Sequence, residues 1–479
     1  MRSRLSCTIK RRPASWLEGR KVTTQNVAGN RRGLASLTEP IEPMETADEE
    51  QPLIDLDNDD MVFVKEKRKS VKFLDRHWLR DSCDCNICVD PDSGQKNFGT
   101  CEVPTKLPIA EASITADGGL DIVWENDFLS QGNHVSHYSA LQLLGSSDRR
   151  KKTAIQVPKW TLWDKDIYEQ DRLTIDYDEW MAGEGGFISG LHQLNSHGLV
   201  FLRNVPSSEQ SVVSIANQIG NIQETFYGRT WDVRSKPNAE NVAYTNSFLG
   251  LHQDLLYLDN TPRIQLLHCL ENTCEGGDSL FSDAARASSL ARIAPDRIHE
   301  YLCSRDLRYS YKKHGHYYEN SHSILNKDSP TVFWSPPFQS NEQIMPTTKP
   351  YYPFYRQWLD AANKFRHLLE DEQWMYQYKM QPGECVIFDN LRVLHGRKQF
   401  DTATGSRHLK GTYIANDTFW SKLQTLAPQL IAIGKGDKGS LVRQATILNE
   451  KHKVWDSAKY RAMHSEPRPP KTRLRYLLA

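Results

Sequence analysis

The chain has 479 residues, 38% of them hydrophobic, and its 60 Lys and Arg residues balance 60 Asp and Glu residues. A neutral chain of this length is expected to fold into two or three domains, and it lacks the basic excess of a nucleic-acid-binding protein. No apolar run reaches the roughly 18 residues that span a bilayer. We therefore expect neither nucleic acid nor a membrane as a partner. The odd number of cysteines, nine, also argues against a secreted disulfide scaffold.

The first 60 residues change the sign of their charge abruptly. Residues 1–38 contain nine basic residues and a single acid, Glu18, whereas residues 41–60 contain nine acids and no base. An Arg-rich, acid-poor start is typical of a mitochondrial presequence, and the alternative is a basic tail on a cytoplasmic protein. We predict a presequence followed by an acidic linker over residues 1–60, and the mitochondrial matrix as the location.

The next segments predict a small β domain over residues 61–145. A short apolar run at 61–64 is consistent with a strand, and residues 113–124 indicate two strands around a Gly turn. Residues 146–175, which include a run of four basic residues, are predicted to be a connector.

Residues 176–430 mix short strands with helices. We expect buried strands at 198–203, 386–389 and 411–415, and amphipathic helices at 211–219 and 355–371. Many short strands in one domain predict a jelly-roll, or double-stranded β-helix, flanked by helices. The fold class is therefore mainly β with flanking helices (α+β), with a small β domain before it and a C-terminal extension over residues 431–479.

The triplet His252-Gln253-Asp254 is the most informative motif. Residues i and i+2 of a strand point to the same face, so this imidazole and this carboxylate would converge on one metal ion. His395, which follows the strand predicted at 386–389, is the best candidate for a second imidazole. Two His and one carboxylate form the facial triad of non-haem Fe(II) oxygenases. Taken alone the triplet is a weak signal, because many such triplets are surface residues.

An arginine follows the second histidine by twelve residues. In a barrel strand, Arg407 could hold the distal carboxylate of 2-oxoglutarate through two parallel hydrogen bonds. Ser279 adds a hydroxyl that could assist. The alternative for an isolated arginine is an ordinary surface salt bridge.

Several segments together carry a resemblance to a known family. They occur in order at residues 227–231, 241–245, 252–254, 265–269, 276–278, 388–390, 394–397 and 406–409. This series resembles γ-butyrobetaine dioxygenase and trimethyllysine dioxygenase, the Fe(II)- and 2-oxoglutarate-dependent hydroxylases of carnitine biosynthesis. The resemblance implies Fe(II) at His252, Asp254 and His395, 2-oxoglutarate as cosubstrate, ascorbate as reductant in an assay, and a homodimer.

A second metal site is predicted in the N-terminal domain. Cys83, Cys85 and Cys88 place three thiols within six residues, which favours a structural Zn²⁺ with four protein ligands in a reduced protein. The family's N-terminal domain is similar, with Trp-Leu-Arg-Asp, then Cys-x-Cys-x-x-Cys, then a distant His before Tyr-Ser. The resemblance implies His137 as the fourth ligand. The rivals are Cys101, His134 and His77, and the alternative to a metal site is free buried cysteines.

Four aromatic residues match the family's cage for a quaternary ammonium group: Tyr227, Trp231, Tyr244 and Tyr413. A trimethylammonium cation has no N–H to donate, and ring faces attract it, although any one of these rings could simply pack in a core. Asn241 matches the residue that binds the substrate carboxylate in the butyrobetaine enzymes. The resemblance thus favours γ-butyrobetaine as substrate and L-carnitine as product, with O2 consumed and succinate and CO2 released.

One segment departs from the family. Residues 332–339 contain consecutive prolines, Pro336 and Pro337, where the family has an Asn-containing segment. Two prolines reshape a loop and remove two backbone donors, so a contact to the substrate carboxylate would be lost or supplied by Gln339 or Asn341. Trimethyllysine or another small metabolite is therefore the alternative substrate. The non-enzyme alternative is an inactive oxygenase fold that serves as an interaction protein.

Overall fold

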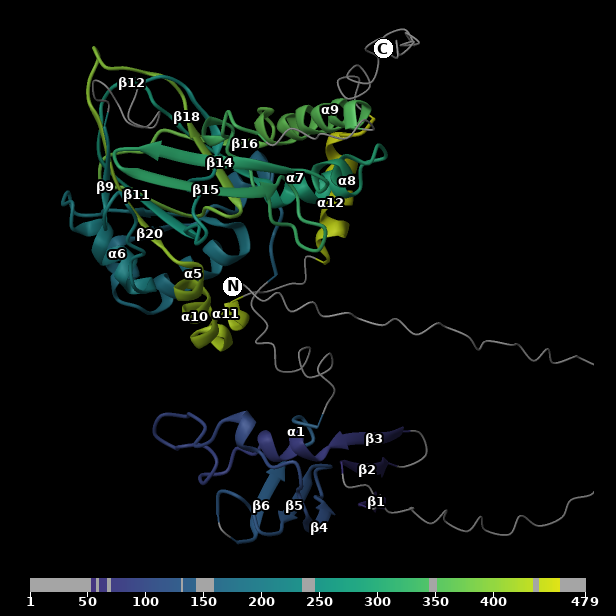
Figure 1. Ribbon diagram of the computed structural model, residues 1–479. Coiled ribbons are helices and arrows are strands. Elements are labelled where there is room, and N and C mark those ends of the chain that lie inside the picture. Colours follow the sequence, from purple (N-terminus) through teal and green to yellow (C-terminus); the bar gives the residue numbers. More distant parts are fainter. Residues whose placement is uncertain are drawn as a thin grey trace, which may run out of the picture. The chain divides into compact units, whose positions relative to one another are not determined.

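The computed structural model describes residues 53–56, 60–66, 70–130, 132–143, 159–234, 246–343, 351–433 and 439–456. The chain divides into two compact units, Met1–Leu144 and Gly145–Ala479, which are shown in Figure 1. The predicted presequence lies outside the described residues, as do the predicted substrate contacts Asn241 and Tyr244.

The first unit contains two antiparallel sheets and a short helix. One sheet has the order β1-β2-β3 and the other the order β4-β5-β6. The elements are β1 Leu53–Asp55, β2 Met61–Glu66, β3 Ser70–Asp75, α1 Arg76–Asp81, η1 Thr100–Glu102, β4 Ile109–Ile114, β5 Leu120–Trp124 and β6 His134–Tyr138. The strands predicted at 61–64 and within 113–124 correspond to β2, β4 and β5. Gly118, with φ of +79°, makes the turn between β4 and β5 because glycine adopts this conformation without a steric cost.

The second unit is built on two sheets that carry the predicted jelly-roll. A four-stranded sheet has the order β10-β18-β13-β16, and a six-stranded sheet has the order β7-β8-β17-β11-β20-β9. The strands are β7 Thr174–Asp176, β8 Leu199–Arg203, β9 Trp231–Arg234, β10 Leu249–His252, β11 Ile264–Asn272, β13 Ser279–Asp283, β16 Met375–Tyr378, β17 Cys385–Asp389, β18 Val393–Arg397 and β20 Arg407–Ile414. Two further pairs are β12 Glu275–Gly276 with β19 Phe400–Asp401, and the hairpin β14 Asp306–Lys313 with β15 His316–Ser323.

Helices cover both sides of this barrel. Figure 1 shows α5, α6, α10 and α11 gathered on one side and α7, α8, α9 and α12 on another. The helices are α3 Lys165–Asp171, α4 Tyr177–Met181, α5 Gly185–His197, α6 Ser211–Ile219, α7 Ala284–Arg292, α8 Ile298–Leu302, α9 Tyr351–Glu370, α10 Asn416–Thr425, α11 Ala427–Ile433 and α12 Leu441–His452, with η3 at Pro336–Phe338. The predicted fold class, a double-stranded β-helix with flanking helices, is confirmed. No helix in the described ranges is long and apolar enough to cross a membrane.

Two strands of the six-stranded sheet are buried along their whole length. Every residue of β17 and of β20 is buried, and the apolar run of β17 is typical of a strand covered on both faces. β20 also buries Arg407, His408 and Lys410, and these charged residues break the apolar pattern. This is why the sequence predicted only the second half of this strand.

Segments predicted to be a connector and an extension belong to the second unit. In the connector, Trp163 and Tyr168 are fully buried. In the extension, Gln444 of α12 accepts a hydrogen bond from the Leu162 backbone at 2.9 Å and donates one to the Trp160 carbonyl at 3.0 Å. Helix α12 therefore ties the C-terminal part of this unit to the segment that precedes its first strand.

We expect Asp164→Ala to destabilise the second unit. The buried Asp164 carboxylate caps α3 at Ile167 N (2.8 Å) and pairs with Lys451 (2.8 Å) and His452 (2.7 Å) of α12. Loss of the cap and of the buried pair should lower the free energy of unfolding by roughly 2–3 kcal/mol in urea. Asp166→Ala is the matched control, because Asp166 shares Lys451 but is exposed. Equal losses for the two variants would contradict the role of Asp164.

Candidate active site

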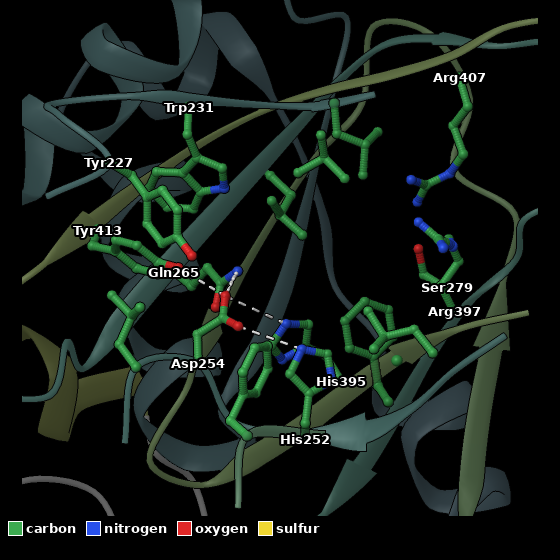
Figure 2. A pocket seen from close by; sticks show the side chains of 18 of the residues that line it. Tyr227, Trp231, His252, Asp254, Gln265, Ser279, His395, Arg397, Arg407 and Tyr413 are labelled. Atoms are coloured by element: carbon green, nitrogen blue, oxygen red, sulfur yellow. Dashed lines mark hydrogen bonds and ion pairs between the residues drawn. The ribbon is translucent and has the colours of Figure 1, made fainter. Parts of the chain in front are cut away.

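The two predicted histidine ligands lie side by side on paired strands. β10 and β18 are antiparallel, with His252 directly opposite His395. Asp254 lies two residues beyond the end of β10, where the chain turns at Leu255 with φ of +62°. The ligand atoms of the three residues lie within 4.8 Å of one another. Figure 2 shows the three side chains pointing toward one another. The structure therefore brings the predicted triad together, although the carboxylate stands after the strand and not within it.

The hydrogen bonds and burial of both imidazoles are compatible with metal binding. His252 Nδ1 donates a hydrogen bond to the Gly250 carbonyl at 2.9 Å, and its Nε2 lies 3.4 Å from Asp254 Oδ1. Burial, together with the neighbouring His252, lowers the pKa of His395 to about 3, so the His395 ring is neutral. Two imidazoles and one carboxylate in a buried pocket fit Fe(II).

The Asp254 carboxylate is held by residues from the opposite sheet. Gln265 Nε2 of β11 and the Tyr413 hydroxyl of β20 both donate to Asp254 Oδ2, at 2.8 and 2.7 Å. Burial would raise the pKa of Asp254, but its interactions with His252 and His395 and the hydrogen bond from Tyr413 lower the pKa overall. The carboxylate is therefore ionised, with Oδ2 occupied by two donors and Oδ1 next to His252.

Two arginines, Arg397 and Arg407, give one wall of the pocket a positive charge. Arg407 opens β20 and is 7% exposed, and no carboxylate of the described residues forms an ion pair with it. Burial lowers the pKa of Arg407 to about 10; burial and then the charge of Arg407 lower the pKa of Arg397 to about 9. Both guanidinium groups keep their charge at neutral pH. Ser279, directly opposite Arg397 on the paired strand, lies in the same wall. This wall fits the distal carboxylate of 2-oxoglutarate.

Aromatic residues line the other side of the pocket. Trp231 and Tyr413 stack with ring centroids 3.9 Å apart, and Tyr227 and Tyr257 are also lining residues. Gly411 lies beneath the indole, where a Cβ atom would meet Trp231 Cε2 at 2.5 Å. In Figure 2 the aromatic side chains and the arginines stand on opposite sides of the triad. Two different ligands could thus reach one metal ion from opposite sides.

The proline segment places a ring beside the triad. Ser335 and Gln253 tie this segment to the metal-binding turn: Gln253 Nε2 donates to the Val332 carbonyl at 2.9 Å, and Ser335 Oγ donates to the Gln253 carbonyl at 2.7 Å. η3 then brings Phe338 into the pocket wall, 5.8 Å from the His252 ring. Gln339 and Asn341, the predicted polar replacements, are not among the described lining residues.

The cysteine cluster of the first unit has a different fourth member from the one predicted. The Sγ atoms of Cys83, Cys85 and Cys88 lie 3.4, 3.6 and 3.5 Å from His134 Nε2. His137 is the wrong residue: it is exposed and pairs with Asp121. The reason is strand parity, because alternate residues of β6 are buried and His134 and His137 point to opposite faces. The Cys₃His set fits a structural Zn²⁺.

Several residues that line the iron pocket were missed from the sequence, among them Tyr257, Gln265 and Arg397. Gln265 and Arg397 both lie in segments that carry the resemblance, at 265–269 and 394–397, but neither was given a role. The register of the paired strands could have identified Gln265 and Arg397, because each lies opposite a predicted site residue. Gln265 is paired with Tyr413 and Arg397 with Ser279.

Comparison with known proteins agrees with this geometry. The sequence matches "Taurine catabolism dioxygenase TauD, TfdA family" over residues 163–413. It is 34% identical over 367 residues to "Dioxygenase str8" of Strobilurus tenacellus, covering 72% of this chain and 83% of that protein. It is 28% identical over 363 residues to "Gamma-butyrobetaine dioxygenase" of Pseudomonas sp. (strain AK-1), covering 73% and 89%. It is 27% identical over 376 residues to "Trimethyllysine dioxygenase, mitochondrial" of Bos taurus, covering 77% and 86%.

The fold and the site together define an oxygenase that uses iron and 2-oxoglutarate. The chain belongs to the TauD/TfdA family and, within it, is a 2-oxoglutarate-dependent dioxygenase of the γ-butyrobetaine and trimethyllysine dioxygenase type. The predicted enzyme class is confirmed. Membership of this family favours an enzyme over the alternative of an inactive oxygenase fold.

Removal of a donor to Asp254 should weaken metal binding. We expect Tyr413→Phe and Gln265→Leu each to lower the affinity for Mn²⁺, a redox-stable substitute for Fe(II), by roughly 10- to 100-fold in calorimetry. Tyr378→Phe is the control, because this hydroxyl donates to Glu384 and is not among the lining residues. Wild-type Mn²⁺ affinity in both test variants would show that these donors do not position the carboxylate.

Arg407→Met should weaken 2-oxoglutarate binding strongly without loss of the metal. Two charge-assisted hydrogen bonds are worth roughly 3 kcal/mol, so KM for 2-oxoglutarate should rise more than about 100-fold while Mn²⁺ affinity is unchanged. Arg203→Met, on an exposed position of β8, is the control. An unchanged KM would refute the anchoring role.

Proposed function

We propose that the chain hydroxylates an aliphatic C–H bond of a small quaternary-ammonium carboxylate, and that γ-butyrobetaine, which yields L-carnitine, is its substrate. The observation that carries this proposal is the aromatic wall beside the triad, in which Tyr227, Trp231 and Tyr413 lie on the side away from the arginines. Aromatic faces attract a cation that cannot donate a hydrogen bond.

Each part of the pocket then has a task. His252, Asp254 and His395 would hold Fe(II), and Arg407 with Ser279 would hold the distal carboxylate of 2-oxoglutarate. The iron, when bound, supplies the activation of O2 that couples decarboxylation of 2-oxoglutarate to C–H hydroxylation. The protein contributes orientation of the two substrates and exclusion of water. The site needs no positioned general base, because radical hydrogen abstraction does not use one.

Relatives support the substrate class. Two of the three relatives described above are named for γ-butyrobetaine and for trimethyllysine, both of which carry a trimethylammonium group. Asn241, the predicted contact for the substrate carboxylate, remains a prediction because it lies outside the described residues.

One observation favours a second candidate. Phe338 stands in the pocket wall next to His252, where the family pattern has an Asn-containing segment. An apolar ring near the reacting position would suit a less polar substrate than γ-butyrobetaine. The second candidate is therefore the same hydroxylation on another small, less polar metabolite.

A coupled assay distinguishes these candidates. The purified chain receives Fe(II), ascorbate and 2-oxoglutarate. Succinate is followed with γ-butyrobetaine, trimethyllysine or 5,5-dimethylhexanoate, an isostere of γ-butyrobetaine in which an uncharged tert-butyl group replaces the trimethylammonium group. We expect succinate and L-carnitine with γ-butyrobetaine, and a kcat/KM about 5- to 30-fold higher than for the isostere, from a cation–π preference of about 1–2 kcal/mol.

The variant Trp231→Leu should remove most of that preference. A variant that lowers the cation and the isostere equally would exclude a cage role for Trp231. Faster turnover of the isostere by the wild-type chain would support the second candidate, and turnover only with trimethyllysine would change the substrate within the same class.

We also propose that the enzyme acts in the mitochondrial matrix as a homodimer. The charge pattern of residues 1–38 supports the location, and the bovine relative is named as mitochondrial. Residues 1–60 fused to a fluorescent protein should accumulate in mitochondria, and the same fusion with its first six basic residues changed to Gln should not. Cytosolic fluorescence from the unaltered fusion would reject the presequence.

A further inference from the structure

A buried arginine contacts the cysteine cluster of the first unit. Arg80 is 0% exposed and lies on α1, three residues before Cys83. Its Nη1 donates to Cys88 Sγ at 3.2 Å, while its Nε and Nη2 donate to the two carboxylate oxygens of Asp127 at 2.5 and 2.9 Å. One guanidinium therefore joins a predicted metal ligand to a buried carboxylate.

Two aromatic rings and the Asp127 carboxylate fix the position of the Arg80 side chain. Its guanidinium carbon lies 5.3 Å from the Phe98 ring centroid and 4.8 Å from that of Phe128, and these two rings pack edge to face. Asp127 is fixed in turn, because it accepts hydrogen bonds from the backbones of Leu129 (3.0 Å) and Ser130 (3.2 Å). The N–H donor to sulfur is thus preorganised and needs no rearrangement when a metal binds.

The chemistry of the cluster calls for such a donor. Three thiolates and a neutral imidazole around Zn²⁺ leave one net negative charge in a buried site, where uncompensated charge is costly. A charged N–H donor to one sulfur stabilises the negative charge that this sulfur carries as a metal ligand. Groups outside the ligand shell that bond to ligands change metal affinity by roughly 10- to 100-fold.

We propose that Arg80 is a positioning residue for the zinc site, and that its hydrogen bond to Cys88 keeps the metal bound. This proposal rests on zinc binding at Cys83, Cys85, Cys88 and His134. It assigns a role to the arginine of the Trp-Leu-Arg-Asp segment, which the iron chemistry does not use.

A matched set of variants separates this role from simple packing. Arg80→Met alone would leave Asp127 buried and unpaired, so the test variant is Arg80→Met with Asp127→Asn, which removes both charges. Asp127→Asn alone is its reference, because Arg80 remains to donate to Cys88. Lys96→Met is the control cation: Lys96 lies 4.5 Å from the same Phe98 ring and pairs with Asp81, but the structure gives it no thiol contact.

Zinc content and zinc release to a chromogenic chelator are measured on the full chain, with thermal unfolding as a check on the fold. We expect about one zinc per chain in the wild type, and release roughly tenfold faster in the double variant than in Asp127→Asn. Lys96→Met should match the wild type. In the Co²⁺-substituted chain, the sulfur-to-metal charge-transfer band should move to longer wavelength in the double variant, because its sulfur loses an N–H donor.

Each outcome decides one question. Faster release with the red-shifted band in a folded double variant supports the role of Arg80. Equal release rates and an unshifted band in the double variant and Asp127→Asn overturn it while leaving the zinc site intact. A wild-type chain without zinc overturns the metal site and the role of Arg80 with it.

Discussion

The hydrogen bonds on the Asp254 carboxylate are the constraint on which the catalytic unit depends. Asp254 follows β10 of the four-stranded sheet, whereas its donors Gln265 and Tyr413 belong to the six-stranded sheet. The Asn390 side chain, just after β17, also makes two hydrogen bonds with the backbone of Asp254. It accepts from the N–H at 2.8 Å and donates to the carbonyl at 3.1 Å. The carboxylate therefore joins the two sheets, and the separation of the sheets determines whether Gln265 and Tyr413 can reach it.

The two metal sites are assembled in different ways. The zinc ligands come from a short thiol-rich turn and one strand of a small unit, so local structure nearly completes the set. The iron ligands come from segments more than 140 positions apart in the chain, His252 and His395, and only the paired register of β10 and β18 unites them. Assembly of the Cys₃His set therefore depends on fewer long-range contacts than assembly of the iron triad.

The sequence predicted the iron site better than the structural reasons for it. His252 and His395 were found from a motif and a resemblance, and both lie where the prediction requires. Asp254 was expected on the same strand face as His252, but the strand ends at His252, and a left-handed turn with the Asn390 contacts places the carboxylate instead. No local pattern in the sequence reports a contact across 136 residues.

The zinc prediction failed at one residue for a related reason. His134 and His137 lie three residues apart on β6, and only the register of this strand decides which of them faces the thiols. The charged residues at the start of β20 likewise concealed the strand that carries Arg407, because burial of charge is decided by the pocket and its ligand and not by the local apolar pattern.

Gly411 determines how closely the Trp231 indole approaches the backbone of β20. The indole of Trp231 rests on a backbone without a side chain, so the width of the aromatic wall depends on the absence of one methyl group. Substrate range in this scaffold can therefore change by a single-residue step on β20 that leaves the ligands, the arginines and the sheet register untouched. Enlargement at this position would displace the indole and change the shape of the pocket, which makes Gly411 a first position for redesign.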